Sequence, residues 1–592
     1  MKRHILSIAF VLLCLTSCDF LDQTPQDKVS PEDYFKTEQD LQLFTNPLYN
    51  NMLDKTPYEA QSDHYVHLNL STLIRGGNAR TVPASGGGWT WTNLRRMNTL
   101  LGNLDKCEDP AVATKYEALT KFFRAYFYFE KVKRFGDVPW IDKELESTDT
   151  EILYGKRDSR EFIMTKMLED VDFAIVNLGS EVSTYRVNRW AALALKAQFC
   201  LYEGTFRKYH GLTLDGNDYQ YYLDLAAKAA KEIIDNGPYQ LASDYRMLFA
   251  QVDADANEYI LAINNDYALQ ICNNTCAYAL MPTQGCPGLT RKFVNSFLMK
   301  DGSRFTDKEG WETMEFKDQT KDRDPRLGYC TITPGYKRLG ATRVSAPDLG
   351  SSVTGFQISK YVMDCTLPEV DRVGKSYNDM PVYRLAEVYL IYAEALAELG
   401  TITQNDLDIS VNLLRDRVGM PHMNLLEANA DPDPYLSSEK YGYRNVAKDG
   451  NEGIILEIRR ERSIELAQEN KRWDDLMRWK EGLCLNQELY GIYFSGPGEY
   501  DLTGDNIADI LLYVEGNKPQ KSNENVVEYQ LGSDLILTEE TKGYIAPHAE
   551  VGDVNRTGFN EERDYLYPVP INERTLNPEL TQNPGWDDGL SY

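Results

Sequence analysis

LTKFFRAYFYFEKVKRFGDVPW, residues 119–140, says most about how this chain folds. Apolar side chains such as Phe122 and Phe127 occur around much of the circumference of the helix that this stretch would form. A helix that is apolar on several sides is enclosed by other elements. Gly136 and Pro139 end it. The stretch therefore predicts a central helix inside a helical body.

Amphipathic spacing on both sides of this stretch predicts further helices. They are expected to open at Ser30-Pro31 and to follow at about 89–103, 160–178, 189–204, 219–235, 382–399, 404–417 and 453–482. Short breaks between consecutive helices favour antiparallel pairs that stack like tetratricopeptide units. No internal repeat of about 34 residues supports this interpretation, which depends on helix pairing alone.

The segments between the helical ones are different in character. Residues 56–88 and 237–378 lack a sustained period, and residues 484–560 are irregular and partly extended. Alternating runs at 258–263 and 355–361 are strand candidates. The expected fold class is mostly α, with tetratricopeptide-like helix pairs, loop-rich regions and small β elements.

The N-terminus reads as a secretory signal. Lys2 and Arg3 precede an apolar run over residues 5–15, which is too short to span a bilayer, and the run ends in Leu-Thr-Ser-Cys at Cys18. That ending resembles a bacterial lipobox, in which the cysteine is acylated and becomes the mature N-terminus. The alternative is an ordinary cleaved signal with an incidental cysteine, but position, flanks and small residues favour lipidation at Cys18. Residues 1–17 are then the signal peptide.

The charge balance excludes several partners. The 592 residues hold 90 acidic and 63 basic side chains, a formal charge of −27. Removing residues 1–17 takes away two bases and no acids, which leaves 90 against 61, or −29. Such a surface repels phosphate backbones, so nucleic acid is not expected as a partner, nor is anionic lipid bound through charge.

The cysteines favour neither a metal site nor a disulfide framework. Beyond Cys14 and Cys18, eight of the ten cysteines remain, and their one cluster is Cys272, Cys276 and Cys286. No nearby histidine completes a zinc site. A loop disulfide from Cys272 or Cys276 to Cys286 is the alternative to free buried thiols, and free thiols are favoured.

Several stretches, taken together and in order, resemble the SusD/RagB family of nutrient-binding outer-membrane lipoproteins. Besides residues 119–140 and the lipobox, they are NRWAALALKAQFCLYEG (188–204), LMKDG (298–302), KDRDPRL (321–327), MPVYRLAEVYLIYAEALAELG (380–400), VNLLRDRVGMP (411–421), ILEIRRERSIELAQENKRWDDLMRWK (455–480) and YLYPVPINERTLNPELTQNPGW (565–586). No single piece is decisive, whereas the ordered set is specific and spans nearly the whole chain.

The resemblance implies an architecture and a function. Residues 18–30 would be a lipid-anchored tether, 31–251 a SusD-like N-terminal helical region, and 252–592 a SusD/RagB C-terminal region with loop-rich insertions. Family members lie on the outer membrane, facing outward, and associate with a SusC/RagA-type TonB-dependent barrel. They capture an extracellular oligosaccharide, or a peptide in RagB-like branches, and they are not enzymes.

Glycan capture needs flat aromatic faces beside hydrogen-bonding groups. The segment 61–93 offers such groups, and in glycan-binding relatives an aromatic platform occurs in this region. Trp89 and Trp91 follow a glycine run that leaves them uncovered by bulky neighbours. The candidate ligand-binding residues are Asp63, Tyr65, Arg75, Trp89, Trp91 and Asn93, together with Tyr278 and Trp311 from the irregular middle.

An acidic loop at residues 501–509 predicts a structural calcium ion. Oxygen donors fall on alternate positions, as in loops that wrap a hard cation: the side chains of Asp501, Thr503, Asp505 and Asp509, and the carbonyl of Ile507. The loop is not an EF-hand, because position twelve is Leu512. A turn-rich acidic loop without metal is the alternative.

Catalytic motifs are absent from the sequence. There is no HExxH, GxSxG, GxGxxG or P-loop. In residues 455–480 the acids and arginines are interleaved with isoleucines, which predicts ion pairs between helices and no catalytic role. Two other classes stay open beside the binding lipoprotein: a secreted helical glycoside hydrolase, and a scaffold that binds proteins only.

Overall fold

The computed structural model describes residues 34–53, 62–548 and 557–591. The predicted signal peptide, the acylation site Cys18, the tether at 18–30 and the helix start at Ser30-Pro31 lie outside these ranges. Within them, no helix combines the length and the apolar character needed to cross a membrane.

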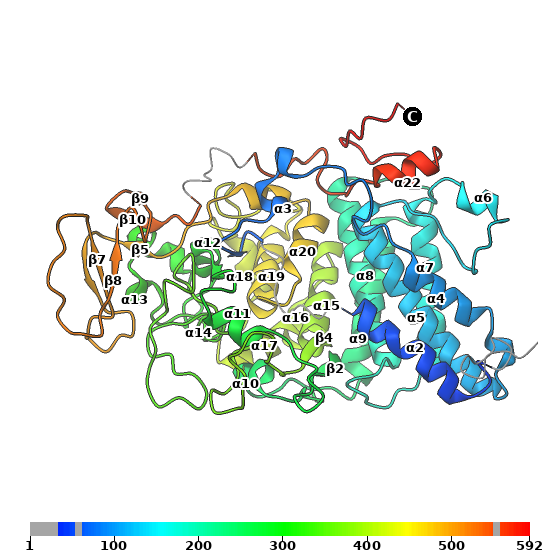
Figure 1. The fold of residues 1–592 in the computed structure, drawn as a ribbon, viewed down its shortest axis with the longest axis horizontal. Coiled ribbons are helices and arrows are strands. Elements are labelled where there is room, and N and C mark those ends of the chain that lie inside the picture. The colour runs from blue at the N-terminus through cyan, green and yellow to red at the C-terminus, as the bar shows by residue number, and fades with distance from the viewer. Residues whose placement is uncertain (1–33, 54–61, 549–556, 592) are drawn as a thin grey trace, which may run out of the picture.

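Long helices stacked side by side form the N-terminal half, in the right part of Figure 1. Helix α5 (Pro110–Phe135) packs against α7 (Arg160–Asn177), and α8 (Arg189–His210) packs against both α7 and α9 (Tyr219–Asn236). Helix α15 (Leu385–Leu399) joins them by packing on α9 and α8. The predicted mostly α fold with stacked helix pairs is confirmed.

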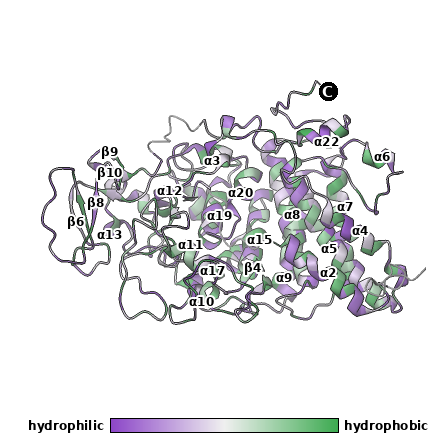
Figure 2. Ribbon diagram, viewed as in Figure 1, coloured by the Kyte–Doolittle hydropathy of each residue, from purple (hydrophilic) through white to green (hydrophobic). Residues whose placement is uncertain are grey.

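Local signals explain where the long helices begin and end. Asp109 caps α5 by accepting a hydrogen bond from the Ala111 amide at 2.8 Å, and Pro110 occupies the first turn, where no donor is lost. Gly136 ends α5 with φ at 73°. In Figure 2 these helices carry both hydrophobic and hydrophilic residues, and their buried apolar side chains form one core cluster.

Most of the C-terminal half consists of short elements in the left and middle parts of Figure 1, around α19 (Glu452–Glu465) and α20 (Arg472–Arg478), whereas the C-terminal end lies at the upper right. The remaining helical elements are α2 (Glu38–Met52), α3 (Thr72–Arg75), η1 (Gly77–Ala79), α4 (Thr92–Leu101), η2 (Leu104–Lys106), α6 (Thr150–Leu153), α10 (Tyr245–Ala250), α11 (Thr275–Leu280), α12 (Arg291–Ser296), η3 (Phe305–Asp307), η4 (Trp311–Thr313), α13 (Phe316–Gln319), α14 (Arg326–Cys330), α16 (Gln404–Asp408), α17 (Val411–Val418), α18 (Leu425–Ala430), η5 (Gly482–Asn486) and α22 (Ile571–Leu576).

The described strands form small separate sheets. Antiparallel pairs join β1 (Tyr65–Val66) to β3 (Gly288–Leu289) and β2 (Tyr259–Ile263) to β4 (Met380–Arg384). The other two sheets have the orders β5-β10-β9 and β6-β7-β8, made of β5 (Tyr493–Phe494), β6 (Gly498–Tyr500), β7 (Ile510–Tyr513), β8 (Val527–Gln530), β9 (Leu537–Glu539) and β10 (Lys542–Ile545). Of these pairings only β7 with β8 is parallel.

Helix α2 begins at Glu38, where Thr37 forms a capping box with Asp40. Two sequence-based predictions of continuous helices are wrong. The helix expected over 453–482 is divided into α19 and α20, because Gln468 and Asn470 adopt φ near 60° (63° and 59°) between them. The predicted segment 404–417 is likewise divided into α16 and α17. The strand expected at 258–263 is confirmed as β2, whereas residues 355–361 contain only isolated bridges.

Candidate functional site

Asp63, predicted to face a ligand, lies in the interior. Arg472 donates from Nε and Nη2 to its two oxygens at 2.8 Å each, and Lys292 Nζ lies 2.5 Å from Oδ2. Burial alone would raise the pKa of the Asp63 carboxyl, but Arg472 and the neighbouring basic groups hold it well below its usual range. Asp63 therefore fastens its loop to α20, and its carboxylate has no face left for a ligand.

Tyr65 and Tyr278 flank a histidine. Tyr65 is 1% exposed in strand β1, so it offers no ring face to a ligand. Tyr278 is half-buried, and its hydroxyl hydrogen-bonds to the His67 imidazole. Burial lowers the pKa of His67 to about 4 and raises that of Tyr278 to about 12. Ligand contact by Tyr278 stays a prediction.

The two tryptophans before α4 differ in exposure. Trp89 is 5% exposed, with its ring edge-on to Phe135 at a centroid distance of 4.8 Å, so the expectation that no bulky neighbour covers it is wrong. Trp91 is half-buried and lines a surface pocket of about 360 Å³ together with Ile141 and Leu153. Ligand contact by Trp91 stays a prediction.

The predicted residues around the start of α4 lie far from Trp311. Asn93 is half-buried and Arg75 is exposed. Figure 1 shows α4, which follows Trp91, at the right of the view, and α13, which follows Trp311, at the left. The ligand-binding residues predicted from the sequence therefore belong to separate places on the molecule.

Trp311 belongs to an aromatic cluster in the loop-rich half. Its ring meets those of Tyr435 and Tyr441 edge-on, with centroids 5.5 and 5.7 Å apart. The rings of Tyr435 and Tyr441 stack on each other at 4.9 Å. On the neighbouring sheet, Tyr544 of β10 stacks on Tyr490 at 5.4 Å and meets Tyr493 edge-on at 5.5 Å. We call these six residues the aromatic cluster.

Arg291, the first residue of α12, joins the two parts of the aromatic cluster. Its guanidinium carbon lies 5.1 Å from the centre of the Tyr544 ring, and Nη2 donates to the carbonyl oxygens of Trp311 and Glu312 at 3.3 and 3.2 Å. The Tyr544 hydroxyl donates to the Glu312 carbonyl at 2.8 Å. Burial lowers the pKa of Arg291 to about 10, so the guanidinium stays charged at neutral pH and holds the rings in place.

The aromatic cluster has an accessible side with polar groups beside it. Tyr435 is buried, whereas the other five rings are half-buried. Lys440 Nζ lies 4.7 Å from the centre of the Tyr441 ring and 3.7 Å from Glu488 Oε1. The side chain of Glu312 is exposed. Apolar ring faces with an ammonium group and carboxylates beside them can bind a ligand that has both C–H faces and hydroxyls.

Sequence reasoning found only Trp311 of this cluster. Tyr441, the pair Tyr490 and Tyr493, and Tyr544 come from three separate segments of the chain. The β5–β10 pairing brings the last two segments together, because Tyr544 lies opposite Tyr493 in it. The sequence signal was the excess of 38 tyrosines. It does not say which of them meet.

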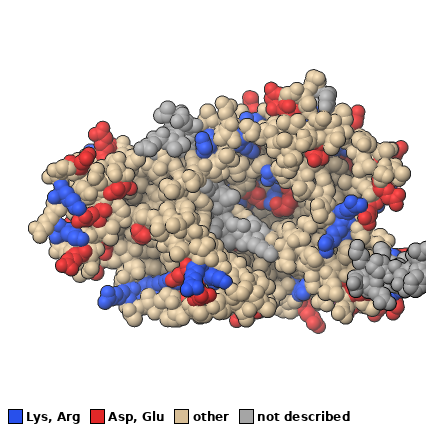
Figure 3. Space-filling model, in the orientation of Figure 1, with Lys and Arg blue, Asp and Glu red and all other residues tan. Residues whose placement is uncertain are grey.

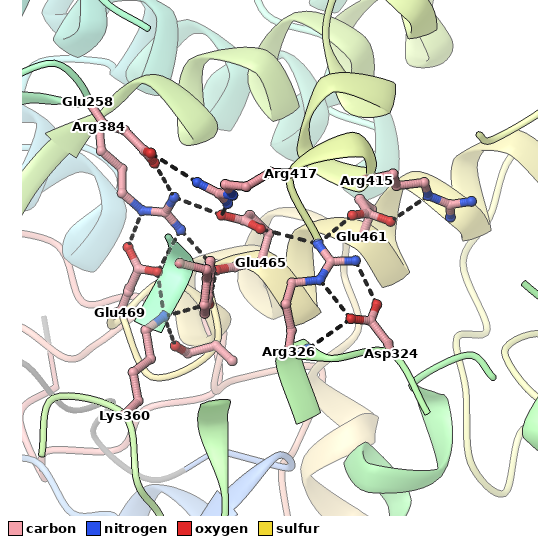
Figure 4. A network of polar contacts seen from close by, with 12 residues as sticks. Glu258, Asp324, Arg326, Lys360, Arg384, Arg415, Arg417, Glu461, Glu465 and Glu469 are labelled. Atoms are coloured by element: carbon pink, nitrogen blue, oxygen red, sulfur yellow. Dashed lines mark hydrogen bonds and ion pairs between the residues drawn. The ribbon is translucent and has the colours of Figure 1, made fainter. Parts of the chain in front are cut away.

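Figure 4 shows the ion-pair network predicted around residues 455–480. Glu461 accepts from Arg326 and Arg415 at 2.5 and 2.9 Å. Glu465 accepts from Arg384 at 2.8 Å and Arg417 at 2.5 Å. Burial would raise the pKa of both carboxyl groups, but the surrounding guanidinium groups lower them below the ordinary value. The prediction of a structural network is confirmed.

The carboxylates of Asp501 and Asp509 in the acidic loop are engaged in hydrogen bonds. Asp501 accepts hydrogen bonds from the amides of Gly504 and Asn506, and its Oδ2 lies 2.9 Å from Lys317 Nζ. Asp509 Oδ2 accepts from the amides of Leu502 and Thr503. Throughout the described ranges, no group of three or more His, Cys, Asp or Glu side chains is placed to hold a metal ion. These hydrogen bonds occupy the carboxylates of Asp501 and Asp509, which favours the alternative of a metal-free acidic turn. Calcium binding by the loop stays a prediction.

The eight cysteines in the described part of the chain are all free, which agrees with the preference for free thiols over a disulfide at Cys286.

Comparison with known proteins gives consistent results. A family model described as the SusD family matches residues 249–586, and a second, described as starch-binding associating with outer membrane, matches residues 19–201. SusD-like protein P2 of Formosa agariphila is 25% identical over 529 residues, covering 83% of this chain and 92% of the relative. A SusD-like protein of Bacteroides ovatus is 23% identical over 508 residues, covering 81% of this chain and 83% of the relative.

Solved structures share the fold. A SusD-like carbohydrate-binding protein from Bacteroides fragilis superposes with a TM-score of 0.67 at 22% identity, covering 92% of this chain and 99% of that one. A second SusD-like protein from Bacteroides fragilis gives a TM-score of 0.62 at 19% identity, covering 95% of this chain and 100% of that one. The SusD family model matches more than half of the length of this chain, and the chain therefore belongs to the SusD family.

Proposed function

We propose that this chain captures an extracellular oligosaccharide on the aromatic cluster, without cleaving it, and delivers it to a SusC/RagA-type TonB-dependent barrel. The observation that carries the proposal is the set of five half-buried rings brought together from distant segments, beside Lys440, Glu312 and Glu488. One matching family model is described as starch-binding, and the similar protein from Bacteroides fragilis is described as carbohydrate-binding, which supports a sugar as the ligand.

The chemistry of the aromatic cluster suits a sugar ring. One face of a pyranose consists of C–H groups, which pack on the flat faces of Trp and Tyr. Its hydroxyls can donate to the carboxylates of Glu312 and Glu488 and accept from the ammonium of Lys440. Because Arg291 lies over the Tyr544 ring and donates to the Trp311 carbonyl, part of the ordering at this surface is already in place before the ligand binds.

Calorimetry on the body that follows Cys18 tests the site. Trp311→Ala and Tyr490→Ala should each weaken oligosaccharide binding about tenfold, since stacking on one ring is worth of the order of 1 kcal/mol or more. Tyr154→Ala is the matched control, because Tyr154 is an exposed aromatic residue (56%) outside the cluster. Full affinity in the Trp311→Ala, Tyr490→Ala double variant, with an unchanged circular dichroism spectrum, would refute the assignment.

Incubation with the same oligosaccharide separates binding from hydrolysis. No new reducing ends should form, whereas their appearance would favour the hydrolase alternative. Binding of peptides and not of sugars would favour RagB-like peptide capture.

Attachment and partner are tested in cells. We propose that acylated Cys18 holds the chain on the outer membrane, facing outward. Cys18→Ala should then release the protein from the membrane fraction, since several acyl chains anchor a protein far more tightly than one. Detergent extracts of the wild type should co-purify with the barrel. An unmodified N-terminus in a freely diffusing wild-type protein would contradict the anchor.

A further inference from the structure

A second concave site, which we call the junction pocket, lies where the long helices meet the loop-rich half. It has a volume of about 370 Å³. Helices α5, α8 and α20, strand β4 and the C-terminal segment all contribute to its wall. Figure 3 shows a hollow over α8 and α20 near the middle of this face, with acidic and basic side chains in it. The aromatic members of the lining are Tyr126, Tyr383, Trp473 and Tyr567.

The charges that line the junction pocket are nearly all paired. Lys133 lies between Glu130 and Asp474, with Nζ 2.8 and 2.6 Å from their oxygens. Lys471 pairs at 2.9 Å with Glu387, which is not part of the lining. The lining residue Glu469 pairs with the buried groups of Arg384 and Lys360. The basic groups among them all have acidic partners, and the group of Lys133 carries one excess negative charge because its single ammonium faces two carboxylates.

Arg134 is the exception. Its guanidinium carbon lies 3.7 Å from the centre of the Tyr567 ring, and Nε donates to the Gly87 carbonyl at 2.7 Å. No carboxylate in the described ranges lies within 4 Å of its nitrogens in an ion pair. Arg134 is thus held in a fixed orientation by the ring beneath it, and its charge is not balanced by a contacting acid. A guanidinium in this state suits an oxyanion such as a carboxylate or a sulfate ester, which presents two oxygens to it for two parallel hydrogen bonds.

We propose that the junction pocket binds a sugar unit that carries an anionic group, with the anionic group on Arg134 and the sugar ring among the aromatic side chains. The volume of about 370 Å³ falls near the lower end of the range of small-ligand sites, which suits one or two pyranose rings. The inference does not rest on the aromatic cluster, which lies on other elements. A carboxylate and a sulfate ester offer Arg134 the same chemistry, so both are tested.

Three monosaccharides separate charge from shape: galacturonic acid, galactose 6-sulfate and galactose. Saturation-transfer NMR titrations at about 150 mM salt screen the long-range repulsion from the formal charge of −27, because the Debye length is then about 8 Å. We expect at least one anionic sugar to bind about tenfold more tightly than galactose, because its anionic group can form charge-assisted hydrogen bonds with Arg134. Equal affinity for all three sugars would overturn the proposal.

Variants locate the effect. Arg134→Gln should abolish the preference for the anionic sugar, and Arg134→Lys, which keeps the charge but not the planar fork, should retain part of it. Arg246→Gln is the matched control, because Arg246 also lies over a tyrosine ring (Tyr336, 5.3 Å) and donates to a carbonyl, but it does not line the junction pocket. It should keep the full preference.

The aromatic cluster supplies the last arm of the experiment. Trp311→Ala should leave the anionic preference intact. Loss of the preference in Trp311→Ala, together with its retention in Arg134→Gln, would place the anionic sugar at the aromatic cluster and refute the inference. If Trp311→Ala loses binding of neutral oligosaccharides and keeps the anionic preference, the result supports the aromatic cluster as the oligosaccharide site and leaves the junction pocket as proposed.

Discussion

Arg384 Nη1 lies 2.8 Å from Oε1 of Glu465, and both side chains are almost wholly buried, at 1% and 0% exposure. Glu465 also accepts from Arg417 and Arg326, so one carboxylate serves three guanidinium groups (Figure 4). Such a cluster is costly to desolvate, and removing one member leaves the others buried without compensation. It also joins α19 to the start of α15 and to α14 and α17, which fixes the loop-rich half against the long helices.

Glu465→Gln should therefore be strongly destabilising. We expect the free energy of unfolding to fall by about 3–5 kcal/mol, the usual cost of breaking a buried ion pair. Urea denaturation measures it. Glu169→Gln is the control, since Glu169 pairs with Lys166 while 57% exposed, and it should change stability by less than about 1 kcal/mol. Equal losses of unfolding free energy in the two variants would show that the buried network stabilises the protein no more than an exposed ion pair does.

Acid should unfold the protein through the same carboxylates. The pKa values of Glu461, Glu465 and Glu469 lie below the ordinary value of 4.5, because nearby cations outweigh burial. The contribution of these ionised carboxylates to the free energy of unfolding is present above about pH 4.5. Below it the unfolded chain takes up protons first, and each carboxylate then costs up to about 1.4 kcal/mol per pH unit. The urea midpoint should therefore fall between pH 5 and pH 4. A separate fall between pH 7 and pH 5 is expected from His67 and His210, because burial lowers their pKa to about 4 while the unfolded chain takes up protons near pH 6.5. A midpoint at pH 4 equal to that at pH 5 would contradict the assignment to the carboxylates.

The parts of the fold that were predictable depend on local signals. The start of α8 follows from Asn188, which caps it by accepting from the Ala191 amide at 3.0 Å, and the start of α5 from Asp109 and Pro110. The break between α19 and α20 was not predictable, because the distant contact from Gln468 Nε2 to the Cys330 carbonyl lies within it. Long-range contacts determined that break.

The candidate site was less predictable for the same reason. An aromatic residue in a glycine-rich or irregular segment reads as exposed, yet Trp89 packs on Phe135 and is buried. Trp311 was found, but its ring partners Tyr435 and Tyr441 belong to a chain segment more than a hundred residues away. Composition indicates that rings are abundant, and only the tertiary structure shows which of them form a surface.

Calcium should have no effect on stability. Asp501 already accepts from two backbone amides and from Lys317, whose ammonium supplies the positive charge that a cation would bring. We expect the melting temperature to stay within about 1 °C whether EDTA or millimolar calcium is added, since a ligand stabilises only if it binds the folded state. A calcium-dependent rise that disappears in Asp501→Asn would show that the acidic loop binds calcium.

Asp501→Ala should nevertheless destabilise the protein. It removes the acceptor of the Gly504 and Asn506 amides, and we expect a loss of about 1–2 kcal/mol. Asp505→Ala is the comparison, because the exposed Asp505 accepts only from the Ile507 amide at 2.8 Å, and its loss should be smaller. Urea denaturation of both variants gives the order, and the reverse order would contradict the hydrogen-bond assignment.

Gly204 tests the packing of α8 on α9, because helix propensity and packing predict opposite signs there. Replacing a mid-helix glycine by alanine normally stabilises a helix by about 1 kcal/mol. A Cβ at Gly204, however, would lie 2.7 Å from Leu223 Cγ and 3.1 Å from the Leu223 backbone nitrogen. The backbone of α9 would have to move, and overpacking of this kind costs about 1–3 kcal/mol. We therefore expect Gly204→Ala to lower the urea midpoint and Gly204→Leu to lower it further, while Gly179→Ala, whose added Cβ meets nothing within 4 Å, leaves it unchanged or slightly raised. A stabilised Gly204→Ala would mean that the two helices are not in close contact at this glycine.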